Sequence, residues 1–158
     1  SLQDFTTPVP GVIETMEQLR REGIRIGSTT GYTDAMMKIV QPGAAAQGYT
    51  VDCLVIPDHL PAGRPAPYMI YRNMTELAIP SVDEVVKVGD TIADIREGLN
   101  AKVCSVGVIT GSNELGLTEE LYTLKQEVRE RMMAAGAHYV LDNIRELPDL
   151  IHNLMNKK

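Results

Sequence analysis

A short apolar segment that runs into a glycine, an aspartate and a helical pattern is the feature that most constrains this chain. Residues 84–88 have the β-branched, apolar character of a buried strand, and Gly89 and Asp90 follow at its end. Residues 91–100 then have helical spacing, so the segment predicts a strand, a tight turn and a helix. In open α/β sheets, ligands bind at the carboxyl ends of the strands, which is where this turn places its aspartate.

Strand and helix patterns alternate along the rest of the chain. Apolar, β-rich runs occupy residues 24–28, 51–56, 103–108 and 138–141, and helical spacing covers 12–22, 33–41, 67–77, 119–135 and 144–155. Gly23 can supply a left-handed cap after the first helix, and Pro148 fits the first turn of the last. The alternation predicts one α/β domain over residues 1–158, a three-layer, Rossmann-like parallel sheet with helices on both faces.

The composition narrows the function classes. The chain has 158 residues, with 15 Lys and Arg against 21 Asp and Glu, and its net charge of −6 disfavours a nonspecific nucleic-acid-binding protein. No apolar run reaches membrane-spanning length and none has the form of a signal peptide, so we expect no membrane association and a cytoplasmic location. Cys53 and Cys104 lie far apart in apolar segments and are predicted to be buried free thiols.

Asp90 and Asp94 lie one helical turn apart at the predicted sheet edge. Mg²⁺ takes oxygen ligands, commonly one or two carboxylates together with waters and a substrate phosphate, so the pair predicts a magnesium site. An aspartate near a helix start can instead cap backbone N–H groups, and this alternative stays open for the strand–Gly–Asp–helix junction. Asp94 lies deeper in the turn, where we expect that capping does not account for it.

Two other strand ends carry groups suited to a phosphate. Residues 28–31 (Ser-Thr-Thr-Gly) offer hydroxyls, a glycine amide and a following helix N-terminus, although a Ser/Thr-rich turn can equally serve only as a cap. Arg64 lies in a proline-rich loop after the strand at 51–56, where its guanidinium can clamp an oxyanion or remain a solvated surface charge. The conjunction of the three strand ends is more informative than any one of them.

In this order, the Thr/Gly loop, the arginine loop and the Asp-x-x-x-Asp motif resemble the second, third and fourth motifs of the haloacid dehalogenase superfamily of phosphotransferases. Most relatives have Lys in the third motif, and the arginine here makes the chain similar to the phosphonoacetaldehyde hydrolase (phosphonatase) family. The similar segments are residues 27–33, 61–65 and 88–91, with further stretches at 47–49, 106–109, 111–112, 114–120 and 136–138. The resemblance covers nearly the whole chain.

This resemblance implies hydrolysis of the carbon–phosphorus bond of phosphonoacetaldehyde, a small-molecule phosphonate, to acetaldehyde and phosphate. In that family a cap lysine forms a Schiff base with the aldehyde, an aspartate on the first strand attacks phosphorus, and water hydrolyses the aspartyl phosphate. Carried onto this sequence, Thr30 and Gly31 would hold the phosphoryl group, and Arg64 would neutralise its developing charge. Asp90 would ligate Mg²⁺, and Asp94 would orient the metal site.

The resemblance also implies parts that this chain does not contain. The family's first strand with its nucleophilic aspartate, and its cap with the Schiff-base lysine, precede the matching part, so we expect this chain alone to be inactive. Lys87 is expected to point along its strand away from the loop edge, and no other lysine is a substitute. Because the first strand lies at the middle of the family's sheet, we expect open strand edges and, with them, a homodimer or association with the N-terminal segment.

Two other functions remain open. Another phosphatase of the haloacid dehalogenase type would act on a phosphate ester, but would normally have Lys in place of Arg64. A noncatalytic module that keeps a phosphate and Mg²⁺ pocket would also lack the nucleophile. The coding sequence upstream of Ser1 distinguishes such a module from the enzyme.

Overall fold

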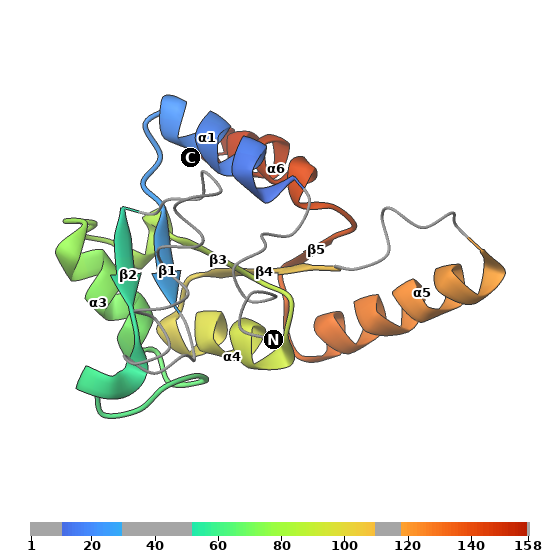
Figure 1. The fold of residues 1–158 in the computed structure, drawn as a ribbon, viewed down its shortest axis with the longest axis horizontal. Coiled ribbons are helices and arrows are strands. Elements are labelled where there is room, and N and C mark those ends of the chain that lie inside the picture. Colours follow the sequence, from blue (N-terminus) through green and yellow to red (C-terminus); the bar gives the residue numbers. More distant parts are fainter. Residues whose placement is uncertain (1–10, 30–51, 110–117, 158) are drawn as a thin grey trace.

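The structure, a computed structural model, describes residues 11–29, 52–109 and 118–157. In these segments strands and helices alternate as predicted (Figure 1). The helices are α1 (Val12–Arg21), α3 (Tyr68–Glu76), α4 (Ile92–Ala101), α5 (Glu119–Ala134) and α6 (Leu147–Asn156), and the strands are β1 (Gly27–Thr29), β2 (Cys53–Val55), β3 (Val86–Gly89), β4 (Cys104–Val108) and β5 (Tyr139–Leu141). The helix predicted at 33–41 and the predicted site residues Thr30 and Gly31 lie outside the described residues.

Every strand pairing in the described segments is parallel, as the alternation predicted. β1 pairs with β2, with Gly27 opposite Cys53, and β4 lies between β3 and β5, with Gly89 opposite Gly107. Within these segments β1 and β3 are not paired with each other. The central strand that the resemblance implies stays a prediction.

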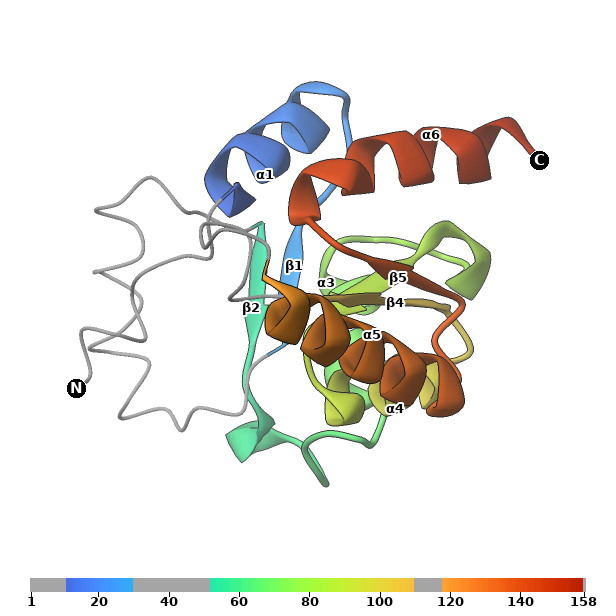
Figure 2. The same ribbon diagram turned by 90° about the vertical axis from the view of Figure 1, so that its right-hand side faces the viewer.

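Helices cover both faces of the strands, which confirms the predicted layers. α1 and α6 lie together on one side, and α4 and α5 lie on the other (Figures 1 and 2). Apolar side chains fill the space between each helix pair and the strands, and a third group fixes α3 against α4. The first cluster contains Leu19, Ile26, Val108, Ile144 and Leu147, the second Ile95, Ile109, Met132 and Ala137, and the third Ile70, Ala101 and Val103.

Several local features differ from the sequence-based expectations in their bounds. The strand expected at 84–88 begins only at Val86, because the 3₁₀ turn Val82–Glu84 precedes it, with the Ser81 hydroxyl accepting from the Asp83 N–H. The last helix is likewise divided into a 3₁₀ turn, Ile144–Glu146, and α6.

Other expectations agree with the structure or need only a small correction. Gly23 has φ of +86° after α1, and Pro148 lies in the first turn of α6, as predicted. Cys53 and Cys104 are free, but both are half-buried rather than buried. None of the helices in the described segments combines the length and the apolar character needed to cross a membrane.

Candidate active site

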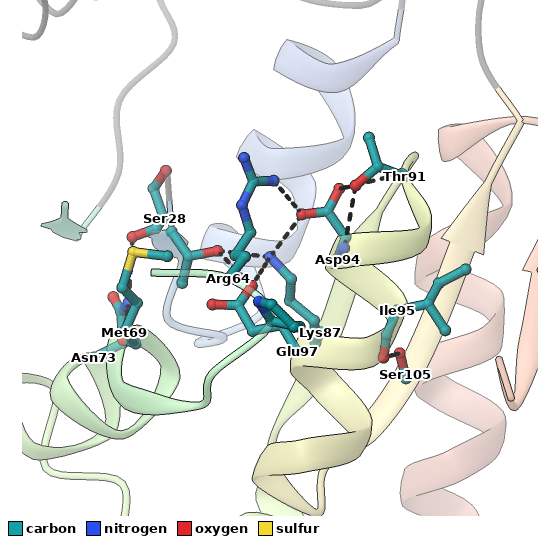
Figure 3. A network of polar contacts seen from close by, with 12 residues as sticks. Ser28, Arg64, Met69, Asn73, Lys87, Thr91, Asp94, Ile95, Glu97 and Ser105 are labelled. Atoms are coloured by element: carbon teal, nitrogen blue, oxygen red, sulfur yellow. Dashed lines mark hydrogen bonds and ion pairs between the residues drawn. The ribbon is translucent and has the colours of Figure 1, made fainter. Parts of the chain in front are cut away.

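Arg64, in the loop that follows β2, and Asp94, in the first turn of α4, meet at the start of that helix. Arg64 Nη1 is 2.6 Å from Asp94 Oδ1, and the two side chains are 28% and 7% exposed. The structure therefore brings together the third and fourth of the predicted motifs (Figure 3). The guanidinium reaches solvent with part of its surface, so it can contact an anion while it remains paired with the carboxylate.

The loop that carries Arg64 is fastened to α4 at a second point. The side-chain amide of Asn100, near the end of α4, donates to the carbonyl oxygen of Pro65 at 2.7 Å. The Ala66 N–H closes a turn by donating to the Gly63 carbonyl at 3.0 Å. The arginine is thus held between two attachments to the same helix, which limits the positions that its guanidinium can take.

Asp94 caps α4, contrary to the expectation that capping would not account for it. Thr91 is the N-cap, its hydroxyl accepts from the Asp94 N–H at 3.1 Å, and Asp94 Oδ2 accepts from the Thr91 N–H at 3.2 Å and from its hydroxyl at 2.8 Å. This reciprocal pair is a capping box, in which the third helical residue returns a bond to the cap. Burial would raise the pKa of Asp94, but the charge of Lys87, together with Arg64 and Thr91, holds that pKa below its usual value.

Asp90 lies directly after β3 and is exposed at the carboxyl end of the strand. Its carboxylate is a hard oxygen donor at the sheet edge, which fits a Mg²⁺ ion that keeps most of its waters. Both oxygens of Asp94 already accept hydrogen bonds, so Asp94 fits an orienting role better than that of a direct ligand. In the part of the chain that the structure describes, no group of three or more His, Cys, Asp or Glu is arranged to hold a metal.

Lys87 reaches the site, so the expectation that it points away from the loop edge is wrong. Its Nζ lies 2.6 Å from the Thr29 hydroxyl, 3.2 Å from Glu97 Oε1 and 3.6 Å from Asp94 Oδ1, and the side chain is only 11% exposed. Figure 3 shows the ammonium of Lys87 between the carboxylates of Asp94 and Glu97. A four-carbon stem spans several ångströms, so the direction of the strand did not determine where the charge would lie.

Glu97 is a second site residue that the motifs did not identify. It lies one turn after Asp94 on α4, its side chain is 0% exposed, and its Oε1 also accepts from the Thr29 hydroxyl at 3.3 Å. Burial raises the pKa of Glu97, and Lys87 opposes that shift. A signal for this residue was present in the sequence, because residues three apart on a helix share a face.

Two glycines allow α4 to lie this close to β3 and β4. A Cβ on Gly89 would stand 2.3 Å from Asp94 Cβ, and one on Gly98 would stand 2.8 Å from the Ser105 hydroxyl and 3.1 Å from Lys87 Cβ. Separations below 3 Å do not occur between unbonded carbons, so larger residues would displace the helix. The glycines therefore set the distance between the helix and the strands that carry the charged groups.

The end of β1 is held on its other side by α3. Asn73 Nδ2 donates to the Ser28 carbonyl at 3.2 Å and to the Met69 carbonyl at 2.9 Å. Thr29, the last residue of β1, is the one that Lys87 contacts, and it immediately precedes Thr30 in the sequence. The structure thus places Ser28 and Thr29, the first half of the predicted phosphate loop, beside α3 and α4, while the roles of Thr30 and Gly31 stay predictions.

Two family models match overlapping parts of this chain, and the charged residues of the site lie in the overlap. The model described as haloacid dehalogenase-like hydrolase matches residues 1–102, and a related model, described as HAD-hydrolase-like, matches residues 61–147. The first match includes Arg64, Lys87, Asp90, Asp94 and Glu97.

Curated relatives are similar over the whole chain. A phosphonoacetaldehyde hydrolase of Parabacteroides distasonis is 67% identical over 99% of this chain, and one of Bacteroides fragilis is 59% identical over 100% of it. In both cases the chain spans 63% of the relative's length.

Solved structures agree with the fold. A phosphonoacetaldehyde hydrolase-like protein from Oleispira antarctica matches 96% of this chain with a TM-score of 0.88 and 32% identity, and the match covers 58% of that protein. A HAD family hydrolase from Deinococcus radiodurans, solved with bound phosphate and sodium, matches 94% of this chain and 61% of its own with a TM-score of 0.75. Its identity is 17%, so it bears on the fold alone.

Proposed function

Because the chain belongs to the haloacid dehalogenase-like hydrolase family, we propose that the complete protein is a phosphonoacetaldehyde hydrolase. It would cleave the carbon–phosphorus bond with water to give acetaldehyde and phosphate. The observation that carries the proposal is the pairing of Arg64 with Asp94 at 2.6 Å, in a chain 67% identical to a phosphonoacetaldehyde hydrolase. Arginine at this position is also the residue that separates the phosphonatase motif from the lysine of most relatives.

The described residues would serve phosphoryl binding and charge stabilisation. Arg64, fixed by Asp94, would contact the oxygens of the phosphoryl group as negative charge develops on them. Asp90 would hold Mg²⁺, whose chemistry when bound is to neutralise phosphoryl oxygens. Thr30 and Gly31, which directly follow the end of β1, would complete the phosphate loop.

The covalent steps would need groups from outside residues 1–158. A Schiff-base lysine would turn the departing carbon into an enamine, and an aspartate would take the phosphoryl group before water releases it. Lys87 does not fit the Schiff-base role, because its side chain is 11% exposed and its ammonium is engaged by Thr29, Asp94 and Glu97. This assignment keeps the expectation that residues 1–158 alone are inactive.

The test is turnover by the protein expressed from its complete gene. Acetaldehyde and phosphate should appear in equal amounts from phosphonoacetaldehyde, and phosphoglycolate, a phosphate ester, should release little phosphate. Arg64→Ala should lower kcat about 100- to 1000-fold, the usual loss for one stabilising donor. Arg72→Ala is the matched control and should leave kcat unchanged. Arg72 is 50% exposed, and among the salt bridges of the described residues its one partner is the exposed Glu76.

Two results would contradict the proposal. Preferred release of phosphate from the ester would assign the protein to the phosphate-ester hydrolases, and binding of phosphate without turnover of either substrate would favour a noncatalytic module. Unchanged turnover in Arg64→Ala would remove the arginine from the site.

A further inference from the structure

The ammonium of Lys87, on β3, contacts side chains of both β1 and α4, at the point where the Thr29 hydroxyl also donates to Glu97. It donates to Thr29 on β1 at 2.6 Å, and it lies 3.2 Å from Glu97 and 3.6 Å from Asp94 on α4. Lys87 itself belongs to β3, which is not paired with β1 in the described segments. This one side chain therefore contacts both the end of β1 and α4, the helix that carries Asp94 and Glu97; Figure 3 shows Lys87 beside these two carboxylates.

A contribution to stability does not explain the buried ion pair of Lys87 and Glu97. Glu97 is 0% exposed, and its Oε2 has no hydrogen-bond partner among the described residues. Removing two charges from water commonly costs as much as their attraction returns, and an unsatisfied buried oxygen adds to that cost. An apolar pair of the same size would serve packing at least as well, so the retained charges require another reason.

The position of the Lys87 charge supplies that reason. Lys87 and Arg64 share a single oxygen of Asp94, Oδ1, at 3.6 and 2.6 Å. The two cations and the carboxylates of Asp94 and Glu97 sum to zero charge, so the cluster balances internally. Without Lys87, Asp94 Oδ1 would face Arg64 alone, and the 3.3 Å hydrogen bond from the Thr29 hydroxyl to Glu97 Oε1 would join β1 to α4 without the cation that contacts both groups.

We propose that Lys87 is a positioning residue of the phosphoryl site and that Glu97 is its buried counter-ion. Lys87 acts through Asp94, which orients Arg64, and through Thr29, which lies in the predicted phosphate loop directly before Thr30. The inference rests on the proposed function of this same site. It adds the specific requirement that phosphoryl binding depends on a lysine that does not touch the substrate.

The experiment compares Lys87→Met with the double variant Lys87→Met/Glu97→Gln in the protein from the complete gene. The single variant leaves the Glu97 carboxylate buried without its cation, so its Tm should fall. The double variant removes one charge of each sign, so the cluster keeps its net charge and Tm should return close to the wild-type value. If phosphate binding is still weakened in the double variant, neither lower stability nor a changed net charge can be the cause. The loss then reports the position of the groups that Lys87 holds.

The primary measurement is calorimetric binding of inorganic phosphate at a fixed Mg²⁺ concentration. In the double variant the Kd for phosphate should rise about tenfold or more, because losing one hydrogen bond to a charged group has an effect of that size. The KM for phosphonoacetaldehyde should rise with it. The matched control is Arg72→Met/Glu76→Gln, which removes an exposed ion pair of α3 and should leave both values unchanged.

The outcomes separate the two proposals. A double variant that recovers stability and also binds phosphate as the wild type does would overturn the positioning role. A double variant that melts as low as Lys87→Met would overturn the counter-ion role of Glu97. Wild-type protein that binds phosphate but leaves phosphonoacetaldehyde intact would refute the proposed function, and the binding comparison would still decide the role of Lys87.

Discussion

The close approach of Gly89 to Asp94 makes Gly89→Ala the sharpest probe of this site. An alanine Cβ would stand 2.3 Å from Asp94 Cβ and 2.4 Å from its Cγ, so α4 or the end of β3 must move. Overpacking of this kind costs roughly 1–3 kcal/mol, and disruption of the capping box adds about 1 kcal/mol. The sum of about 3 kcal/mol corresponds to a fall in Tm on the order of 10 °C for a protein of this size.

Thermal unfolding followed by circular dichroism, together with phosphate release, would measure the effect in the complete protein. Gly23→Ala is the control: Gly23 has φ of +86° and nothing within 4 Å of the added Cβ, so only backbone strain is introduced. That strain costs about 1–2 kcal/mol and should leave turnover unchanged. Wild-type Tm and turnover in Gly89→Ala would refute the proposed contact between the strand end and the capping carboxylate.

Two further predictions concern the same carboxylate. Thr91→Ala should lower the free energy of unfolding, measured in urea, by about 1 kcal/mol. Thr91→Ser should not lower it, because serine keeps the capping hydroxyl. Equal losses of stability in both variants would contradict the cap. Asp94 has a pKa below its usual 3.8, so its stabilising contribution is present above the unfolded value and is lost as the pH falls through the folded value. Asp94→Asn should therefore lose less stability than the wild type on acidification below about pH 4, and parallel pH profiles would contradict this.

The fold was predictable because its signals are local. Strand and helix periodicities, Gly23 after α1 and Pro148 in α6 each depend on a few neighbouring residues, and the structure confirms them. Bounds were less predictable, because the 3₁₀ turn before β3 depends on the Ser81 side chain rather than on hydrophobic spacing. The parallel pairing followed from the alternation of elements, since parallel strands need a crossover connection.

The charged site was only partly predictable. The meeting of Arg64 with Asp94 followed from placing both after strands of one parallel sheet. The cap differs from the expectation in position: the strand–Gly–Asp–helix pattern points to Asp90, whereas Thr91 is the N-cap and makes Asp94 the third helical residue. The motif Thr-x-x-Asp before an apolar run was visible in the sequence and is a signature of a capping box.

Lys87 could not have been placed from sequence, because its contacts belong to β1 and α4 rather than to its own strand. With Lys87 in this position, Asp94 caps α4 and pairs with the cations through the same carboxylate. Oδ2 fixes the first turn of α4 through Thr91, while Oδ1 receives Arg64 and Lys87. Because one carboxylate makes both sets of contacts, the cap that Thr91 forms on α4 also fixes the oxygen that the two cations share.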